Sequence, residues 1–365
     1  MSRLRVAVIG VGNLGKEHAR ILSALPEVEL AGIADVNSEQ CQAVARRLGC
    51  RAFSSPRPLL HLADAAIVVV PTIHHHAVAG EFLRCGIPLL VEKPLAANLE
   101  QAESLVDLAQ RHHALLQVGH IERFNPAFEE LQRTPLQPKF VQCERLGPFT
   151  GRSTDIGVVL DLMIHDLDVL LNLVRAPVRS VDALGVSVFG GHEDVANARL
   201  HFTNGCVAEL TASRASYAVQ RRMHIWGPEG FASLDFARRQ LTLVQPSDQV
   251  RKHVLDPSKL DPAARAMVKD ELFGRHLQSE TRDCNSSKDQ LTKELQHFIQ
   301  CVQRGQRPLV SGEDGRDAIA LATRVLQSIE THAWEGHEGG PAGPSDLPVP
   351  RGQLFRPAAA GRAAA

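Results

Sequence analysis

The segment VIGVGNLG (residues 8–15) lies between an apolar run and a helical pattern, and it indicates the fold of the first part of the chain. It contains the spacing Gly10-x-Gly12-x-x-Gly15. Glycines so placed allow a tight turn and let the backbone approach a pyrophosphate, which free N–H groups at a helix N-terminus can bind. Glycines also serve ordinary turns, so the spacing is informative only between a strand and a helix.

That context is present throughout the first third of the chain. Near-continuous apolar runs separated by helical patterns are typical of a parallel sheet covered on both faces. We therefore predict an α/β fold, beginning with a doubly wound Rossmann domain over residues 1–122. The apolar runs are residues 4–10, 28–35, 65–70, 88–94 and 114–119, and the helical patterns are residues 13–25, 38–49, 74–86 and 98–113.

Asp35 ends the second apolar run, about 20 residues after Gly15. A carboxylate at this position binds the ribose hydroxyls of a dinucleotide and repels a 2′-phosphate, which favours NAD over NADP. The alternative is a Rossmann-like domain with an empty site. The predicted NAD-binding residues of this turn are Gly10, Gly12, Asn13, Leu14, Gly15 and Asp35.

The pattern changes after residue 123, where short strand-like runs follow one another with turn signals between them. Asn204-Gly205 and Pro228-Glu229-Gly230 are such turns. We predict a second, α+β domain over residues 123–333, with a large, mostly antiparallel open sheet for substrate binding and oligomerisation. Residues 246–289 are polar and predict a loop with a helical turn or two, and residues 288–305 and 313–331 predict helices. Residues 334–365 are rich in Gly, Pro and Ala and predict a disordered tail.

The bulk composition limits the classes of function. The 365 residues carry a formal net charge of −1, which argues against binding of nucleic acid or an anionic membrane. We expect neither a signal peptide nor a membrane-spanning segment. The seven cysteines are scattered without a C-x-x-C pair, which favours reduced thiols in a cytoplasmic protein. The consecutive histidines 74–76 cannot readily converge on one ion, and we predict no metal site.

The helical segment VVLDLMIHDLDVLL (residues 158–171) is apolar but carries acids and a histidine. At ~100° per residue, Asp161, His165 and Asp168 fall on one stripe, whereas Asp166 points elsewhere. Buried charge costs several kcal/mol unless it is paired or used. The stripe is therefore either a surface edge with an i,i+4 ion pair or a functional row.

The segment VEKPLA (residues 91–96) ends a strongly apolar run. Lys93 should therefore lie at the carboxyl edge of the parallel sheet, where ligands bind in such folds. Taken alone, it could equally be an exposed loop lysine.

Three motifs together resemble the Gfo/Idh/MocA family of glucose–fructose oxidoreductases and inositol dehydrogenases. They are the glycine turn, Glu-Lys-Pro at residues 92–94, and Asp-x-x-x-His-x-x-Asp at residues 161–168, and the similarity runs from Leu4 to about Ile329. The resemblance implies that Lys93 and His165 flank a sugar hydroxyl and share its proton as hydride leaves to the nicotinamide. Asp161 would orient or pair with His165, and the stripe would face the cleft between the domains.

The family pattern also implies further cofactor contacts and features of the backbone. His75 matches the histidine near the nicotinamide ribose, Lys93–Pro94 is a candidate cis bond, and the last helix packs back on the first domain. The cofactor residues added by the resemblance are Pro71, Thr72, His75, Glu92 and Lys93.

Residues 118–127, 144–152, 213–216 and 311–322 resemble a branch acting on nucleotide sugars, in particular UDP-N-acetylglucosamine 3-dehydrogenases, whose 3-keto product is later transaminated. Arg123, Arg145 and Arg152 could clamp a diphosphate, although each could equally form a surface ion pair. Asn125 could contact the sugar or the nicotinamide. The predicted substrate-binding residues are Lys93, Arg123, Asn125, Arg145, Arg152, Asp161 and His165.

Other substrates and another class of protein stay open. The ring alcohol could belong to inositol, a free hexose or a sugar acid, and the chain could be a non-catalytic NAD-bound sensor. Retention of Lys93, Asp161 and His165 disfavours the sensor. The resemblance also implies an aminotransferase acting next in the pathway, and a homodimer or homotetramer that buries the uncovered face of the second sheet.

Overall fold

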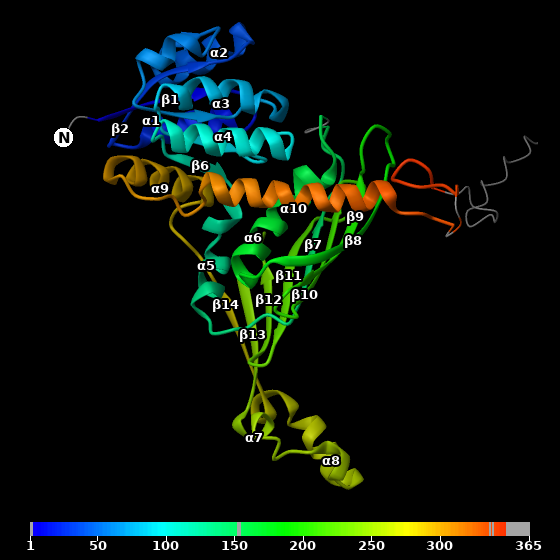
Figure 1. The fold of residues 1–365 in the computed structure, drawn as a ribbon. Coiled ribbons are helices and arrows are strands. Elements are labelled where there is room, and N and C mark those ends of the chain that lie inside the picture. Colours follow the sequence, from blue (N-terminus) through cyan, green and yellow to red (C-terminus); the bar gives the residue numbers. More distant parts are fainter. Residues whose placement is uncertain (1–2, 152–154, 336, 338, 348–365) are drawn as a thin grey trace, which may run out of the picture.

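The computed structural model describes residues 3–151, 155–335, 337 and 339–347. The first domain is the predicted Rossmann fold: a parallel sheet in the order β3-β2-β1-β4-β5-β6, with helices on both faces (Figure 1). Its strands are β1 Leu4–Ile9, β2 Val28–Ala34, β3 Ala52–Phe53, β4 Ala65–Val68, β5 Leu89–Glu92 and β6 Leu116–Gly119. Its helices are α1 Gly15–Ala24, α2 Ser38–Leu48, α3 His75–Arg84 and α4 Leu99–Arg111.

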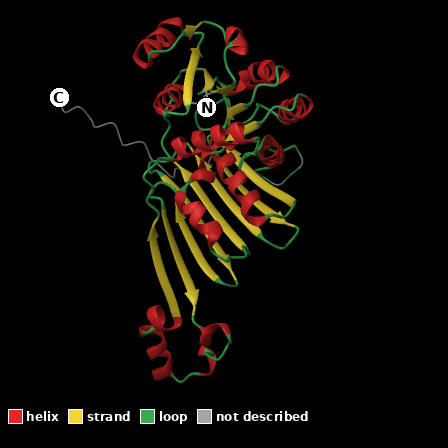
Figure 2. Cartoon of the chain, turned by 90° about the vertical axis from the view of Figure 1, so that its left-hand side faces the viewer, coloured by secondary structure: helices red, strands yellow, loops and turns green. Residues whose placement is uncertain are grey.

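The second domain holds an eight-stranded sheet in the order β14-β13-β12-β11-β7-β10-β9-β8. Neighbouring strands are antiparallel except β7 and β10, which are parallel, so the sheet is mostly antiparallel as expected. Helices cover one face of it (Figure 2). The strands are β7 Phe140–Leu146, β8 Val178–Val186, β9 Val195–Phe202, β10 Val207–Ser213, β11 Gln220–Gly227, β12 Gly230–Asp235, β13 Gln240–Pro246 and β14 Leu277–Asp283.

Four more helices pack against the two domains. They are α5 Pro126–Arg133, α6 Ile164–Val174, α9 Gln290–Arg304 and α10 Gly312–Thr331. Helix α9 adds Leu295, Phe298 and Ile299 to the core of the first domain. Helix α10 packs against α4 of the first domain and against α6 and β8 of the second (Figure 1). The cleft between the domains is thus backed by helices that contact both.

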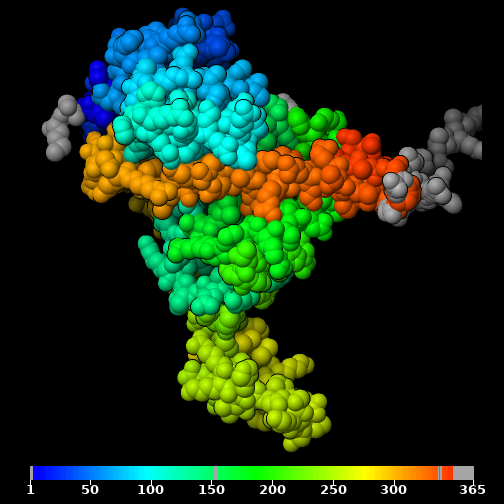
Figure 3. Space-filling model, in the orientation of Figure 1, coloured from blue at the N-terminus to red at the C-terminus, as the bar shows by residue number. Residues whose placement is uncertain are grey.

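One prediction about the later part of the chain was partly wrong. Residues 246–289 were expected to form a loop with a helical turn or two. They do contain two short helices, α7 Asp248–Arg251 and α8 Pro262–Asp270, which project from the body (Figure 3), but they also contain strand β14, which was not expected. Strand β14 reads LQSETRD and is largely exposed, so it lacks the apolar alternation that marks a half-buried strand.

The expected disordered tail begins with ordered structure in its described part. The indole Nε1 of Trp334 donates to the carbonyl of Gly343, whose N–H donates to His332. The N–H of Ser187 donates to Pro344, which ties the segment to the second domain. A single tryptophan and backbone hydrogen bonds thus order a segment whose composition indicated disorder; residues 336, 338 and 348–365 lie outside the described part.

Two further observations concern the described residues as a whole. All seven cysteines are free thiols. Among the helices described, none has the length and hydrophobicity needed to cross a lipid bilayer.

Candidate active site

The turn between β1 and α1 has the geometry of a pyrophosphate cradle. A Cβ on Gly15 would lie 2.0 Å from the carbonyl oxygen of Gly10, and one on Gly10 would lie 2.5 Å from that of Val69. Gly10 also has φ = +89°, which favours glycine. A Cβ on Gly12 would meet no described atom within 4 Å, so this glycine faces open space. The residues present therefore fit a dinucleotide held at the α1 N-terminus, where Asn13 and Leu14 precede the helix.

Asp35 is one of the residues that line an apolar cavity beside this turn. Its Oδ2 accepts from the N–H of Val11 at 2.7 Å and its Oδ1 from the N–H of Asn37 at 2.8 Å. These bonds orient the carboxylate at the end of β2, where a ribose would lie. The cavity is lined by Gly10, Gly12, Asp35, Val36, Gln40, Val69, Val70, Pro71, His74 and Val78, among others, and Thr72 is buried directly after Pro71.

Two predicted cofactor residues are engaged within the protein. His75 is buried, with Nδ1 2.8 Å from the carbonyl oxygen of Pro94 and Nε2 2.8 Å from that of Val70, so it braces the loop after β5. The Lys93–Pro94 bond in this loop is cis, as the resemblance implied. The buried Glu92 accepts from Nε2 of His18 at 2.9 Å and from the N–H of Lys93 at 3.2 Å.

Lys93 meets Asp161 across the cleft between the domains. Its Nζ donates to the Asp161 carbonyl at 2.7 Å and to Asp161 Oδ1 at 3.0 Å. Asp161 lies in a π-helical turn, Val159–Met163, that leads into α6, and His165 follows in the first turn of α6. All three residues line one pocket. Asp161 therefore pairs with Lys93, whereas the resemblance implied that it orients or pairs with His165.

His165 has the properties of a neutral base. Burial, together with the charges of Lys93 and Arg145, lowers the pKa of His165 well below its usual value of 6.5. At pH 7 the imidazole is therefore uncharged and can accept a proton. Its Nδ1 is buried and has no hydrogen-bond partner among the described residues.

The predicted stripe of Asp161, His165 and Asp168 does not face the cleft as a unit. The side chain of Asp168 is only 3% exposed, and its Oδ2 lies 3.7 Å from Arg123 Nε, where α6 packs on α10 and the 3₁₀ turn Ile121–Phe124. Burial raises the pKa of Asp168 to about 7, against the opposing charge of Arg123. Asp168 is one helical turn beyond His165 and is not among the residues that line the pocket.

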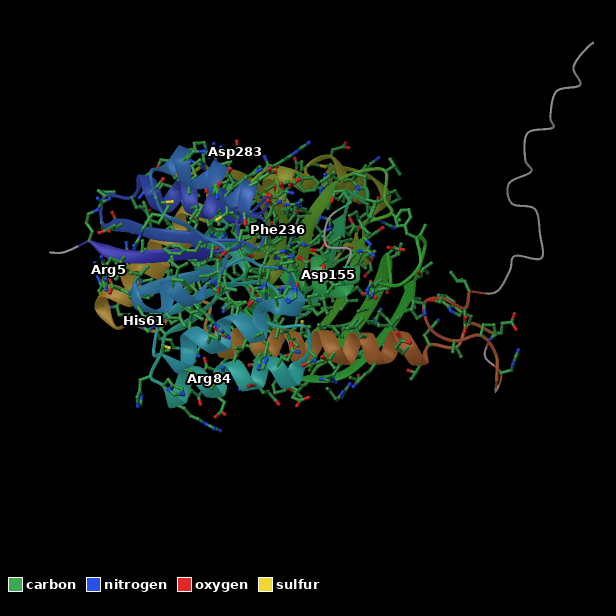
Figure 4. All side chains as sticks on the ribbon, turned by 90° about the horizontal axis from the view of Figure 1, so that it is seen from above. Arg5, His61, Arg84, Asp155, Phe236 and Asp283 are labelled. Atoms are coloured by element: carbon green, nitrogen blue, oxygen red, sulfur yellow. The ribbon has the colours of Figure 1, made fainter. Side chains whose placement is uncertain are left out.

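Arg145 lies in the wall of the pocket but its charge is already compensated. Its Nε and Nη2 donate to Asp166 at 3.0 and 2.8 Å, and its Nη1 donates to Glu122 at 2.9 Å. The guanidinium lies 5.7 Å from the ring centre of Phe236, labelled in Figure 4. A bidentate pair with Asp166 and a second carboxylate leave little positive charge for a diphosphate.

The other predicted substrate residues lie elsewhere. Arg123 is buried, 3.8 Å from Asp314, and donates to the Leu309 carbonyl at 3.3 Å. Asn125 is fully buried: its Oδ1 accepts from the N–H of Ala127 at the start of α5, and its Nδ2 donates to Glu122 and to the Phe236 carbonyl. Their placement does not support contact with substrate, and Arg152 lies outside the described residues.

Two cations in the pocket wall were missed from the sequence. Arg214 lines the pocket and is held by Asp194 at 2.6 Å. Arg221 lines it without a carboxylate partner among the described residues. Strand parity was an available signal, because Met223 and Ile225 of β11 are buried on the helix-covered side, and Arg221 shares their parity.

A glycine turn that fits a dinucleotide, next to a lysine and a neutral histidine in an interdomain pocket, defines a nicotinamide-dependent alcohol dehydrogenase. Residues 4–120 match the family model of oxidoreductases with an NAD-binding Rossmann fold, and residues 136–233 match the GFO/IDH/MocA C-terminal domain. The chain belongs to the Gfo/Idh/MocA family and is an NAD-dependent oxidoreductase.

Comparison with individual proteins places sugar dehydrogenases among its relatives. The chain is 35% identical to UDP-N-acetylglucosamine 3-dehydrogenase of Acidithiobacillus ferrooxidans, over 90% of this chain and 98% of that protein. A solved structure of that enzyme, GnnA, has a TM-score of 0.78 at 34% identity, covering 90% of this chain and 98% of that one. The scyllo-inositol 2-dehydrogenase (NAD(+)) of Bacillus subtilis is 28% identical over 90% of this chain and 94% of its own.

Proposed function

We propose that this protein oxidises the 3-hydroxyl of UDP-N-acetylglucosamine to give a 3-keto nucleotide sugar. The similarity to the Acidithiobacillus ferrooxidans enzyme over 90% of the chain supports this substrate. The observation that carries the proposal is Arg221, a cation without a carboxylate partner among the described residues, in the same pocket as Lys93 and His165. A diphosphate is the part of such a substrate that requires an uncompensated cation.

The three residues at the cleft divide the proton chemistry between them. Lys93, held by Asp161, donates a hydrogen bond to the hydroxyl oxygen and stabilises negative charge on it as the O–H bond breaks. The neutral His165 accepts the proton. NAD, held by the glycine turn and Asp35, supplies the hydride acceptor when bound. The bonds of Lys93 to both the carbonyl and the side chain of Asp161 fix the position of its ammonium group.

The proposal is tested by single turnover at stoichiometric NAD⁺. We expect reduced-nicotinamide fluorescence on addition of UDP-N-acetylglucosamine, but not of free N-acetylglucosamine or inositol. Stoichiometric conditions matter because an unfavourable equilibrium or retained NADH could hide turnover. A signal with inositol or a free sugar alone would contradict the nucleotide-sugar assignment. If NAD binds but none of the three compounds gives a fluorescence signal, the result would favour another substrate or a non-catalytic NAD-bound sensor.

Replacing Arg221 by alanine should raise KM for UDP-N-acetylglucosamine by about 10- to 100-fold, because a hydrogen bond to a charged group contributes about 1.5–3 kcal/mol. Arg222→Ala is the matched control: it lies next in the same strand, has the opposite parity and lies 3.5 Å from Asp235. Steady-state kinetics of both variants decide the point. If both substitutions change KM equally, or if Arg221→Ala leaves KM unchanged, then Arg221 does not bind the diphosphate.

We also propose that the protein is a homodimer or homotetramer. The rings of Phe140, Trp226 and Phe231 form a cluster on the sheet face away from the helices, with ring centres 5.1 Å apart in the pairs Phe140–Trp226 and Trp226–Phe231. An aromatic cluster on an uncovered face favours self-association. Light scattering at micromolar concentration should show at least a dimer, and Trp226→Asp should weaken it. A wild-type monomer would contradict this.

Two further parts of the proposal concern the setting of the reaction. Seven free thiols and a nucleotide-sugar substrate support a cytoplasmic location. The 3-keto group made by the reaction is a suitable substrate for an aminotransferase acting next.

A further inference from the structure

A buried set of polar side chains lies beside His165, and none of them is among the residues that line the pocket. His120, which follows β6, is 1% exposed, and neither of its ring nitrogens has a hydrogen-bond partner among the described residues. The ring centres of His120 and His165 are 6.4 Å apart, and the ring planes are nearly perpendicular at 87°. This separation is too long for a direct hydrogen bond and suits one bridging water between the unpartnered His165 Nδ1 and His120.

The set continues from His120 into the first domain. The Glu92 carboxylate packs on Gly119, the residue before His120, where an added Cβ would lie 2.9 Å from Glu92 Oε2. The other oxygen of Glu92 accepts from His18, whose Nδ1 is also buried without a partner among the described residues. On α9, both carboxyl oxygens of the fully buried Glu294 lack partners in the same described part.

The protonation of the two acids follows from their surroundings. Burial acts to raise the pKa of Glu92, but the hydrogen bond and charge of His18 and the charge of Lys93 outweigh it, so this pKa is lowered. Burial and the neighbouring Glu92 charge raise the pKa of Glu294 well above its usual value. Glu92 is therefore the ionised carboxylate of the pair and Glu294 the neutral acid, so only Glu92 can act as the base of the two.

Such an arrangement is costly if it only fills space. A buried polar atom without a hydrogen bond destabilises the folded protein, and buried water commonly supplies the missing partner. Apolar side chains would pack the same interior without that cost. Buried nitrogens of His165, His120 and His18 and both carboxyl oxygens of Glu294 lack partners among the described residues. Of these residues, His120, His18 and Glu294 each interact electrostatically with Glu92.

We propose that His120 is a proton-relay residue, which passes the proton taken up by His165 through bridging water to the Glu92 carboxylate. The substrate O–H bond breaks and a His165 Nε2–H bond forms, while the C–H electron pair leaves as hydride to the bound nicotinamide. His165 releases its Nδ1 proton to the water, and His120 gains a proton on one ring nitrogen as it loses one from the other. Glu92 ends as the carboxylic acid.

The charges around His120 are consistent with a carrier that never stores the proton. Burial, with the charges of Arg123 and Lys93, lowers the pKa of His120 to about 3. The charged and titratable groups around it come from five elements: Glu92 at the end of β5 with Lys93 after it, Arg123 in the 3₁₀ turn, Asp314 on α10, His165 on α6 and, beyond Glu92, Glu294 on α9. A neutral ring that exchanges one proton for another avoids a lasting buried cation.

The test uses His120→Gln, whose amide keeps hydrogen bonding but cannot exchange protons, and His76→Gln as control. His76 lies on α3, where its Nε2 is 3.0 Å from Ser104 Oγ, outside the path. In single turnover with saturating NAD⁺ and sugar, His120→Gln should slow hydride transfer at least 10-fold and increase the solvent deuterium isotope effect. KM for both ligands should change less than twofold. An unchanged rate, or a loss confined to the NAD dissociation constant, would overturn the relay.

The choice of sugar rests on the proposed function, so a second measurement is independent of it. Ring ¹⁵N spectra of histidine-labelled protein should show that His120→Gln changes the tautomer balance of His165, because its Nδ1 loses a water-bridged partner. His165 shifts unaltered in that variant would overturn the relay whichever sugar is turned over. If His120→Gln does not fold, His120→Asn carries both measurements. If the wild-type enzyme gives no reduced-nicotinamide signal with UDP-N-acetylglucosamine, only the proposed substrate is contradicted, and the relay is not.

Discussion

Replacing His165 by alanine is expected to reduce the rate of hydride transfer by about 10²–10⁴-fold, the range for loss of a positioned general base. The histidine contacts no predicted cofactor residue through a hydrogen bond, so NAD binding should be retained. Lys93→Ala should have an effect of the same size, because it removes the cation paired with Asp161 at 3.0 Å. Single-turnover fluorescence with the active sugar measures both rates, and fluorescence titration measures NAD binding.

His61→Ala is the matched control for His165→Ala, because His61 lies on the surface of the first domain (Figure 4). The pH dependence gives a second check. Since the pKa of His165 is lowered below 6.5, the base form persists on acidification, and the loss of activity at low pH should begin below pH 6.5. An acid limb centred above 6.5, or near-normal turnover by His165→Ala, would assign the base elsewhere.

Replacing Arg145 by methionine is expected to lower the free energy of unfolding by about 3–5 kcal/mol. The substitution removes the bidentate partner of Asp166 at 2.8 Å and the partner of Glu122 at 2.9 Å, all of them nearly inaccessible to solvent. Two buried carboxylates would then be left without their cation. Urea unfolding of the full chain, followed by far-UV circular dichroism, measures the change.

Two comparisons separate lost charge pairing from lost packing. Arg221→Met removes a pocket arginine with no carboxylate partner among the described residues and should change stability by no more than about 0.5 kcal/mol. Adding Glu122→Gln and Asp166→Asn to Arg145→Met should recover part of the loss, because the uncompensated charges disappear. If Arg145→Met destabilises no more than Arg221→Met, the buried ion network contributes little.

The first domain could be predicted because its signals are local. The glycine turn, Asp35 and the alternation of apolar strands with helices each lie within one strand–turn–helix unit, where chain connectivity dictates the geometry. Lys93 belongs to the same class, since the carboxyl edge of a parallel strand is a position that the strand itself defines. The contact between Lys93 and Asp161 was not predicted: the resemblance implied that Asp161 orients or pairs with His165, whereas the structure pairs Asp161 with Lys93 at 3.0 Å.

Tertiary structure alone decided the partners of the other charged residues. Arg123, Arg145 and Asp168 look in the sequence like surface or substrate-binding groups, but each is buried against an opposite charge from another element. Local periodicity shows which side of a helix or strand a residue occupies; it does not show what that side packs against. Arg221 was missed for the same reason. What distinguishes it from the other arginines is that it has no carboxylate partner among the described residues, and the sequence does not show which residues pair.

The sequence alone was therefore enough to predict a Rossmann domain for NAD and a lysine at the carboxyl edge of its sheet, because both features depend on residues that are neighbours in the sequence. Only the packing of α6, α9 and α10 between the two domains decided which ionisable groups face substrate and which face the interior. The physical reason is that pairing and desolvation energies depend on contacts between residues far apart in the chain, such as Lys93 and Asp161, separated by 68 positions.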